Sequence, residues 1–212
     1  MQIEILDIYE NDMDRMLAAV SEGRREKALR MKNETVRRRS LAAAYLLDRM
    51  LEKYRPDVPT PAELSVDENG KPHLFLPDGG EVYFSLSHSG NYAACMLSDV
   101  PCGVDIERSD SRDYEKLLSH VCCEDESLRI ACAEDFYRLW TLKEAAIKAD
   151  GRGFAAGMNR FAVRTAEEDG VATEIPKEAS GTCYDTEIDG RTYRGGAIPA
   201  PEGYLLSYME CV

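Results

Sequence analysis

The order of helical and strand-like segments is the feature that most constrains the fold, because the same order occurs twice. A strand-like start and helical segments occupy residues 1–54, and short strand-like runs follow them up to residue 100. Helical patterns return over residues 113–149, and the rest of the chain is again rich in strand-like runs. Helices followed by a strand meander in each half predict an α+β protein of two similar lobes, residues 1–100 and 101–212.

Two of the expected helices have clear ends. Residues 33–54 carry an apolar stripe, with Asn33 as the N-cap and Pro56 beyond the last turn. Residues 134–149 form a second helix, which Gly151 is expected to end. Shorter helices are expected at residues 12–20, 23–31 and, in the main, 113–132.

The expected strands are short and are separated by turn signals. Residues 82–87 and 92–97 are joined by His88-Ser89-Gly90-Asn91, which indicates a hairpin. A turn at Pro101 leads to a third strand over 103–107. Further strands are expected at 62–67, 160–164, 182–188, 191–198 and 204–211, with Asp189-Gly190 as a second hairpin turn.

Composition excludes several classes of protein. Hydrophobic residues make up 44% and charged residues 31% of the 212 residues, as in ordinary soluble domains. No apolar run reaches the ~18–20 residues of a membrane-spanning helix, and the acidic start is unlike a signal peptide. The seven cysteines are scattered without a C-x-x-C pair, which argues against a disulfide framework or a zinc site. We therefore expect a cytoplasmic protein.

Charge is distributed unevenly along the chain. The net charge of −13 makes nucleic-acid binding unfavourable. Residues 21–55 nevertheless contain eleven basic and five acidic side chains, which makes this basic segment net positive by six. Lys27 and Arg39 are expected near the starts of two consecutive helices, where unpaired backbone N–H groups also favour anions. The segment is either a local anion site or a solvated helix face.

Two carboxylates of the expected strand 103–107 share one face. Strand side chains alternate, so Asp105 and Glu107 point the same way while Ile106 points to the other face. Paired carboxylates suit a hard divalent cation such as Mg²⁺. A merely polar strand face is the alternative, because D-x-E is a common sequence.

The helix 134–149 carries a second pair of charged residues. Glu144 and Lys148 are one turn apart and lie at the border of the apolar stripe that includes Trp140. An ordinary surface ion pair would look the same, and Trp140 fits core packing. His88, flanked by Ser87 and Ser89, and the turn Gly70-Lys71-Pro72 are also unremarkable when each is taken alone.

Taken in order, these pieces resemble the 4′-phosphopantetheinyl transferases, and the long two-lobe Sfp-type branch fits best. The resemblance covers residues 24–154 and rests on four motifs, which are Gly70-Lys71-Pro72, Phe84-Ser85-Leu86-Ser87-His88-Ser89, Gly103-Val104-Asp105-Ile106-Glu107 and the helix from Phe136 through Trp140, Lys143 and Glu144 to Lys148. The short branch is about half this length, acts as a trimer and typically has Phe at the position of Trp140. Arg152 stands where the family often has Lys.

The resemblance implies a monomer that binds coenzyme A in a cleft between two lobes. In the C-terminal lobe, Asp105, Glu107 and Glu144 would hold Mg²⁺ on the pyrophosphate, near Lys148 and Lys143. The N-terminal lobe would hold the adenosine end and its 3′-phosphate through Lys27, Arg39, Lys71, Ser87 and His88.

The implied reaction moves the 4′-phosphopantetheine arm of coenzyme A to a serine of an apo acyl or peptidyl carrier protein. The serine attacks the β-phosphorus and expels 3′,5′-ADP, while Lys148 and Lys143 stabilise negative charge. Glu144, directly or through a metal-bound water, would act as the base, with Glu107 as the alternative. Leu117, Leu118 and Val121 would dock the carrier, or simply pack in the core.

Two other functions remain open at this stage. One is a different Mg²⁺-dependent phosphoryl or nucleotidyl transferase, although the sequence lacks a Walker-type G-x-x-x-x-G-K-[ST] loop. The other is a non-catalytic coenzyme A-binding module of the same fold. Incubation with coenzyme A, Mg²⁺ and an apo carrier would separate these possibilities.

Overall fold

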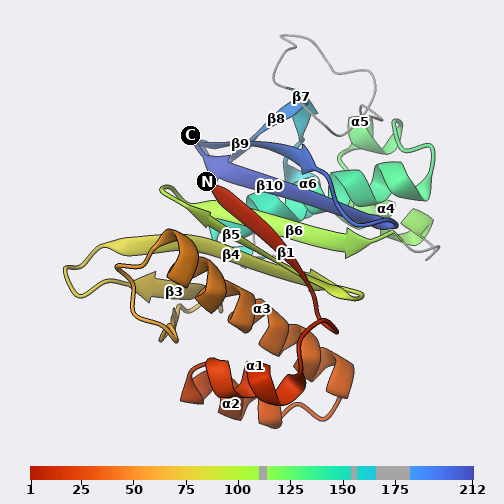
Figure 1. Cartoon of the computed structure of the whole chain (residues 1–212). Helices are drawn as coiled ribbons and strands as arrows, with labels where there is room; N and C mark the ends of the chain where they lie inside the picture. The colour runs from red at the N-terminus through yellow and green to blue at the C-terminus, as the bar shows by residue number, and fades with distance from the viewer. Residues whose placement is uncertain (110–113, 154–156, 166–181) are drawn as a thin grey trace. The chain divides into compact units, whose positions relative to one another are not determined.

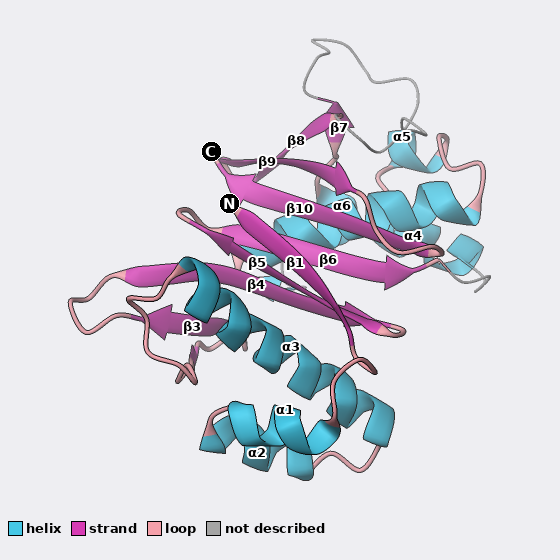
Figure 2. Cartoon of the chain, viewed as in Figure 1, coloured by secondary structure: helices cyan, strands magenta, loops and turns pink. Residues whose placement is uncertain are grey.

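The computed structural model describes residues 1–109, 114–153, 157–165 and 182–212 (Figure 1). The chain divides into an N-terminal unit, Met1–Asp99, and a C-terminal unit, Val100–Val212, one residue from the boundary expected from the sequence. Each unit combines helices with a five-stranded antiparallel sheet (Figure 2). The predicted α+β class is therefore confirmed. Among the described residues, no helix is long and apolar enough to cross a membrane.

The sheet of the N-terminal unit has the strand order β1-β5-β4-β3-β2. Its strands are β1 (Gln2–Asp7), β2 (Ser65–Val66), β3 (Pro72–Phe75), β4 (Glu81–Ser89) and β5 (Tyr92–Ser98). The helices are α1 (Met13–Ala19), α2 (Glu22–Leu29) and α3 (Glu34–Tyr54). The hairpin β4–β5 is confirmed, but β4 is longer than expected, so His88 and Ser89 belong to the strand and the turn is Gly90-Asn91.

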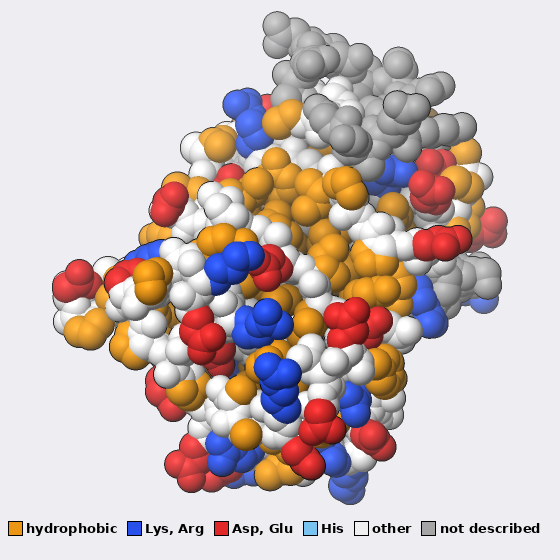
Figure 3. All heavy atoms as spheres, viewed as in Figure 1, with side chains coloured by type: hydrophobic (Ala, Val, Ile, Leu, Met, Phe, Trp, Pro, Cys, Tyr) orange, Lys and Arg blue, Asp and Glu red, His pale blue; other side chains and the backbone are white. Residues whose placement is uncertain are grey.

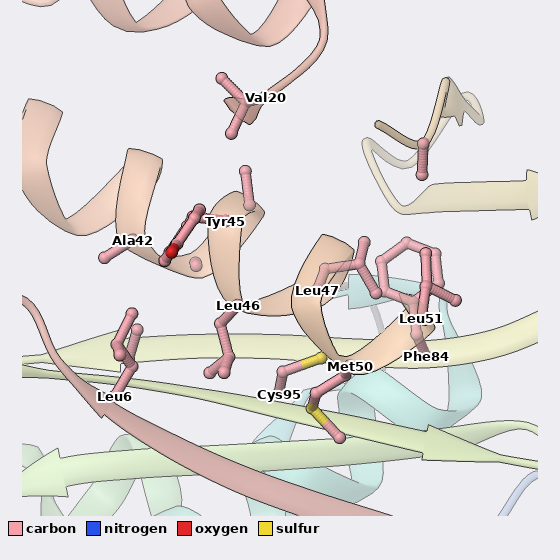
Figure 4. Packing of buried hydrophobic residues seen from close by; sticks show 14 of the residues in the cluster. Leu6, Val20, Ala42, Tyr45, Leu46, Leu47, Met50, Leu51, Phe84 and Cys95 are labelled. Atoms are coloured by element: carbon pink, nitrogen blue, oxygen red, sulfur yellow. The ribbon is translucent and has the colours of Figure 1, made fainter. Parts of the chain in front are cut away.

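Helix α3 supplies most of the core of the N-terminal unit. Its start is fixed by Asn33, whose Oδ1 accepts the backbone N–H of Val36 at 3.1 Å, as the sequence predicts. The apolar stripe packs on β5, β4 and β1, and the side chains of Met50 and Leu51 point toward the sheet that carries Phe84 and Cys95 (Figure 4). This packing fixes the hairpin β4–β5 relative to the first turns of α3.

The sheet of the C-terminal unit has the strand order β6-β10-β9-β8-β7. Its strands are β6 (Cys102–Arg108), β7 (Arg164–Thr165), β8 (Cys183–Ile188), β9 (Arg191–Ile198) and β10 (Tyr204–Cys211). Helix α6 (Ala133–Asp150) runs along β6 and β10 (Figure 1). It ends at Gly151, whose φ of 87° is the left-handed conformation that glycine adopts readily.

Helix α6 approaches β6 unusually closely at Gly103. A Cβ atom at this position would lie 1.9 Å from the carbonyl oxygen of Ala145 and 2.7 Å from the backbone nitrogen of Ala149. Only glycine therefore allows this backbone-to-backbone approach. The contact places the second half of α6 directly over the strand that carries Asp105 and Glu107.

Three expected elements differ from the observed ones. The helical region 113–132 consists of short pieces, η1 (Tyr114–Leu117), α4 (Leu118–Val121) and α5 (Glu124–Ser127), and residue 113 lies outside the described residues. The strand expected at 160–164 is reduced to β7, which follows the short helix η3 (Met158–Arg160). The strand expected at 62–67 is reduced to β2.

Candidate active site

The predicted charged residues of the C-terminal unit lie together where α6 crosses β6. Lys148 Nζ of α6 donates to Asp105 Oδ1 at 2.7 Å and to the carbonyl oxygen of Val104 at 3.1 Å. Asp105 is only 3% exposed, so this ion pair is largely shielded from water on the carboxylate side. The sequence spacing alone could not show that the two motifs meet, and the structure brings them into contact.

Glu144 shares the same environment. The pKa of Glu144 is raised to about 7. Burial is the main cause, the carboxylates of Asp105 and Glu107 act in the same direction, and Lys148 opposes them. A carboxyl group that titrates near neutral pH can exchange protons at physiological pH, as a general base must. Asp105, Glu107, Glu144 and Lys148 therefore form one electrostatic group, which we call the carboxylate–lysine group.

The donor atoms of this group fit a hard divalent cation. Carboxylate oxygens are the ligands that Mg²⁺ prefers, and a cation would relieve the repulsion that raises the pKa of Glu144. Among the described residues, no three metal-ligating side chains already surround one point. An ion bound here would therefore have to draw the carboxylates together and compete with Lys148 for Asp105.

Lys143 does not belong to this group. Its side chain is completely buried, and Nζ donates to Glu126 Oε2 at 2.5 Å. Three backbone carbonyl oxygens complete its surroundings, those of Val121 at 2.9 Å, Met158 at 2.9 Å and Phe161 at 2.8 Å. The expectation that Lys143 contacts coenzyme A or the transition state conflicts with this geometry, because its donors hold the loops of the C-terminal unit.

In the N-terminal unit, Arg39 connects α3 to the hairpin that carries Ser87 and His88. Its Nε donates to the carbonyl oxygen of Gly90 at 2.8 Å, and the side chain is half-buried. This is the only side-chain hydrogen bond of Arg39 within the described part of the chain, and it leaves the terminal nitrogen atoms for a ligand. Ser87 is buried and His88 is exposed, as the alternation along β4 requires. The structure thus brings Arg39 and His88 to the same hairpin.

Lys71 and Lys27 are placed differently from Arg39. Lys71 is half-buried and directly precedes β3, the strand that pairs with β4. Lys27 is exposed in the last turn of α2, so the expectation that it lies near a helix start is wrong. The favourable end of the helix dipole is therefore not available to an anion at Lys27.

Other arginines of the basic segment stabilise the fold instead of forming a ligand surface. The Arg25 side chain donates to the carbonyl oxygen of Leu17 at 2.8 Å, and Arg37 donates to that of Met31 at 2.8 Å. Arg38 donates to two more backbone carbonyls and lies over the ring of Tyr9. On the face in Figure 3, basic and acidic side chains are interspersed over α1 to α3. Sequence reasoning missed this use of the basic residues because their partners are backbone atoms.

Arg152, the departure from the family pattern, also has a structural partner. Its Nε and Nη2 donate to the two carboxylate oxygens of Asp150 at 2.6 and 2.9 Å, and it forms an ion pair with Asp189. Tyr193 OH donates to the same Asp150 carboxylate at 2.9 Å. The planar guanidinium suits this two-point contact, which a lysine cannot make. Arg152 therefore fixes the end of α6 to the turn Asp189-Gly190, and Asp150 links the same end to Tyr193 of β9.

Comparison with known proteins agrees with this arrangement. Residues 101–207 match the family model of the 4′-phosphopantetheinyl transferase superfamily. The 4′-phosphopantetheinyl transferase Sfp of Bacillus subtilis strain 168 is 27% identical over 182 residues, which cover 84% of this chain and 80% of the relative. A second 4′-phosphopantetheinyl transferase of Bacillus subtilis is 32% identical over 169 residues, 77% of this chain and 74% of the relative. A phosphopantetheinyl transferase of Thraustochytrium sp. is 31% identical over 178 residues, 74% of this chain and 62% of the relative.

The matched region includes all of β6 and α6, the two elements that carry the carboxylate–lysine group. The family model covers half of the chain, and the 32% identical relative is matched over three quarters of its length. The sequence motifs, the two α+β units and these similarities lead to the same assignment. The chain belongs to the 4′-phosphopantetheinyl transferase superfamily.

Proposed function

We propose that this protein transfers the 4′-phosphopantetheine arm of coenzyme A to a serine of an apo carrier protein, giving the holo carrier and 3′,5′-ADP. The main support is the carboxylate–lysine group, in which Lys148 Nζ lies 2.7 Å from Asp105 Oδ1 beside Glu144. This arrangement offers carboxylate ligands for a cation, a fixed positive charge and a titratable carboxylate within one small region. Transfer of a phosphoryl-linked group to a hydroxyl needs these three functions.

The proposed metal ligands are Asp105, Glu107 and Glu144, and Mg²⁺ is the proposed ion. Bound there, Mg²⁺ would neutralise charge on the pyrophosphate of coenzyme A. Lys148 supplies a further positive charge to the phosphate oxygens, where negative charge grows as the bond to 3′,5′-ADP breaks. Its hydrogen bond to the carbonyl oxygen of Val104 keeps the ammonium group at β6.

The proposed base is Glu144, with Glu107 as the alternative. The serine hydroxyl must lose its proton as its oxygen bonds to the β-phosphorus, and a carboxylate with a pKa of about 7 can accept that proton near neutral pH. A bound cation would lower this pKa again by favouring the charged carboxylate. Glu144 would therefore take the serine proton either directly or through a water, and a bound ion would set how readily its carboxylate accepts that proton.

The N-terminal unit is proposed to hold the adenosine end of coenzyme A. Arg39 and His88 meet at the hairpin β4–β5, and Lys71 precedes the adjacent strand β3. Arg39 has terminal nitrogens available, and a guanidinium binds phosphate at two points. Ser87 lies beside His88 but is buried, so it supports the hairpin, and the exposed Lys27 adds positive charge.

An acyl or peptidyl carrier protein is the proposed partner. Of the three apolar residues expected to dock it, Val121 is 1% exposed and belongs to the core. Leu118 is partly buried against the same core, whereas Leu117 is 38% exposed on η1. Leu117 is therefore the best candidate of the three for carrier contact. The seven cysteines are free thiols, which supports a reducing, cytoplasmic location, and we infer that the protein acts as a monomer.

The proposal is tested by incubating the protein with coenzyme A, Mg²⁺ and apo carriers and measuring the intact carrier mass. We expect Asp105→Asn to lower transfer at least ~100-fold, because the cation site and the partner of Lys148 are lost together. Glu187→Gln, which removes an exposed carboxylate on β8, is the matched control and should keep full activity. Transfer that persists in excess EDTA would contradict the metal assignment, and absence of transfer to every apo carrier class would contradict the function.

A further inference from the structure

His73 lies between two carboxylates on the sheet of the N-terminal unit. Its Nε2 is 3.1 Å from Asp67 Oδ2, and its Nδ1 is 2.6 Å from Glu81 Oε1. The ring stacks in parallel on Phe75, with 5.7 Å between ring centroids. All three polar side chains are partly buried. His73 is one of only three histidines in the chain, and the proposed reaction does not use it.

The geometry requires the imidazolium form of His73. A neutral imidazole has one N–H, whereas ionised carboxylates only accept hydrogen bonds. Both short contacts can therefore be hydrogen bonds only when both ring nitrogens carry a proton. In agreement, the hydrogen bond to Glu81 and that to Asp67 raise the pKa of His73, while burial opposes them. The charged groups that face the ring are Asp67, from the turn between β2 and β3, and Glu81, from β4.

Asp67 also organises the turn that precedes β3. Its Oδ1 accepts the backbone N–H groups of Asn69 and Lys71, each at 2.9 Å. Its own backbone N–H donates to the carbonyl oxygen of Lys71 at 3.0 Å. Gly70 completes the turn with a φ of 86°. One oxygen of Asp67 thus holds the backbone of Lys71, and the other oxygen contacts His73.

We propose that His73 is a positioning residue for coenzyme A binding: as an imidazolium, it holds Asp67 against Glu81 and thereby fixes Lys71 where it contacts the 3′-phosphate. This inference rests on the proposed function, which places Lys71 at that phosphate. His73 itself does not touch the ligand. When His73 loses its proton, one of the two carboxylate contacts loses its donor, and the turn that carries Lys71 becomes less well fixed.

The test measures the affinity for coenzyme A and for 3′-dephospho-coenzyme A by calorimetry between about pH 6 and about pH 9, a range that brackets a raised histidine pKa. In wild type, the preference for coenzyme A should fall as the pH rises. His73→Gln should lower that preference by several-fold, up to about tenfold, at the acidic end of the range and should leave the affinity for 3′-dephospho-coenzyme A unchanged. Its remaining pH dependence should be weaker than that of wild type.

Two further variants test whether the pH dependence is specific to His73 and whether it acts through Lys71. His120→Gln removes the exposed histidine of α4 and should leave the wild-type profile intact. Lys71→Ala should lose both the preference and the part of its pH dependence that depends on His73. This arm tests the inference even if His73→Gln does not fold.

The outcomes distinguish the inference from the function on which it rests. If Lys71→Ala keeps the full preference for coenzyme A, Lys71 does not bind the 3′-phosphate, and the proposed role of Lys71 fails. If Lys71→Ala loses the preference but His73→Gln keeps it, the positioning role of His73 alone is overturned. Equal weakening of both ligands in His73→Gln would also overturn it, because His73 would then support only the general fold.

Discussion

Replacing Gly103 by alanine tests how α6 and β6 hold the carboxylate–lysine group. The new Cβ would lie 1.9 Å from the carbonyl oxygen of Ala145, whereas ordinary contacts begin at 3.4 Å. The obstacle is the helix backbone, so no side-chain rotation can relieve the clash. Helix α6 would therefore have to retreat by about 1.5 Å, the difference between these two distances.

This retreat has two measurable consequences. Overpacking of this kind costs about 1–3 kcal/mol in the free energy of unfolding, which urea denaturation measures. The same shift would lengthen the 2.7 Å contact between Lys148 and Asp105 beyond hydrogen-bonding distance. Because a misplacement of about 1 Å can cost ~100-fold in rate, kcat for carrier modification should fall by about that factor in the folded fraction.

Two glycine variants serve as controls for Gly103→Ala. Gly23→Ala on α2 places its Cβ more than 4 Å from its neighbours and should stabilise the helix by up to about 1 kcal/mol. Gly195→Ala on β9 meets the carbonyl oxygen of Tyr208 at 1.9 Å and should destabilise the sheet with a smaller effect on kcat. Wild-type stability together with full activity in Gly103→Ala would refute the argument that α6 needs this close approach.

Two further predictions concern buried charges. Lys143→Met should lower the free energy of unfolding in urea by about 3–5 kcal/mol, because it leaves Glu126 buried without its cation. Adding Glu126→Gln to this variant should recover part of the loss. An unchanged midpoint of urea unfolding in Lys143→Met would show that the pair does not support the loops. Burial raises the pKa of Asp48 to about 6, so the carboxyl group binds a proton more tightly in the folded protein than in the unfolded chain. The free energy of unfolding should therefore fall as the pH rises from about 4 to about 6. Asp48→Asn should remove up to about 3 kcal/mol of that fall while its amide oxygen still accepts the backbone N–H, and identical pH slopes in the two proteins would contradict this reasoning.

Features with local causes were predictable from the sequence. Asn33 caps α3 and Gly151 ends α6 through contacts within one helical turn, so residue identity was enough to place both ends. The alternation along β6 likewise predicts that Asp105 and Glu107 share a face. Their meeting with Lys148 was expected only from the family resemblance, because no local pattern encodes a contact between residues 43 positions apart.

Features that depend on distant backbone atoms were not predictable. Lys143 follows Trp140 by three residues and reads as a second phosphate-binding lysine, but carbonyl oxygens from separate loops surround its ammonium group. The arginines of the basic segment also donate to carbonyls, which have no signature in the sequence. From the sequence, Gly103 is only the first residue of the expected strand 103–107, and its role becomes visible only when the position of α6 over β6 is known.

The most direct test of the central claim identifies both products of a single reaction. Coenzyme A, Mg²⁺ and an apo carrier are incubated with the protein, and the released nucleotide and the intact carrier are quantified together by mass spectrometry. We predict one 3′,5′-ADP for each carrier that gains a phosphopantetheine arm, and no reaction with a carrier whose acceptor serine is replaced by alanine. Release of 4′-phosphopantetheine together with a nucleotidylated carrier would contradict the account, and so would loss of coenzyme A without any change in the carrier.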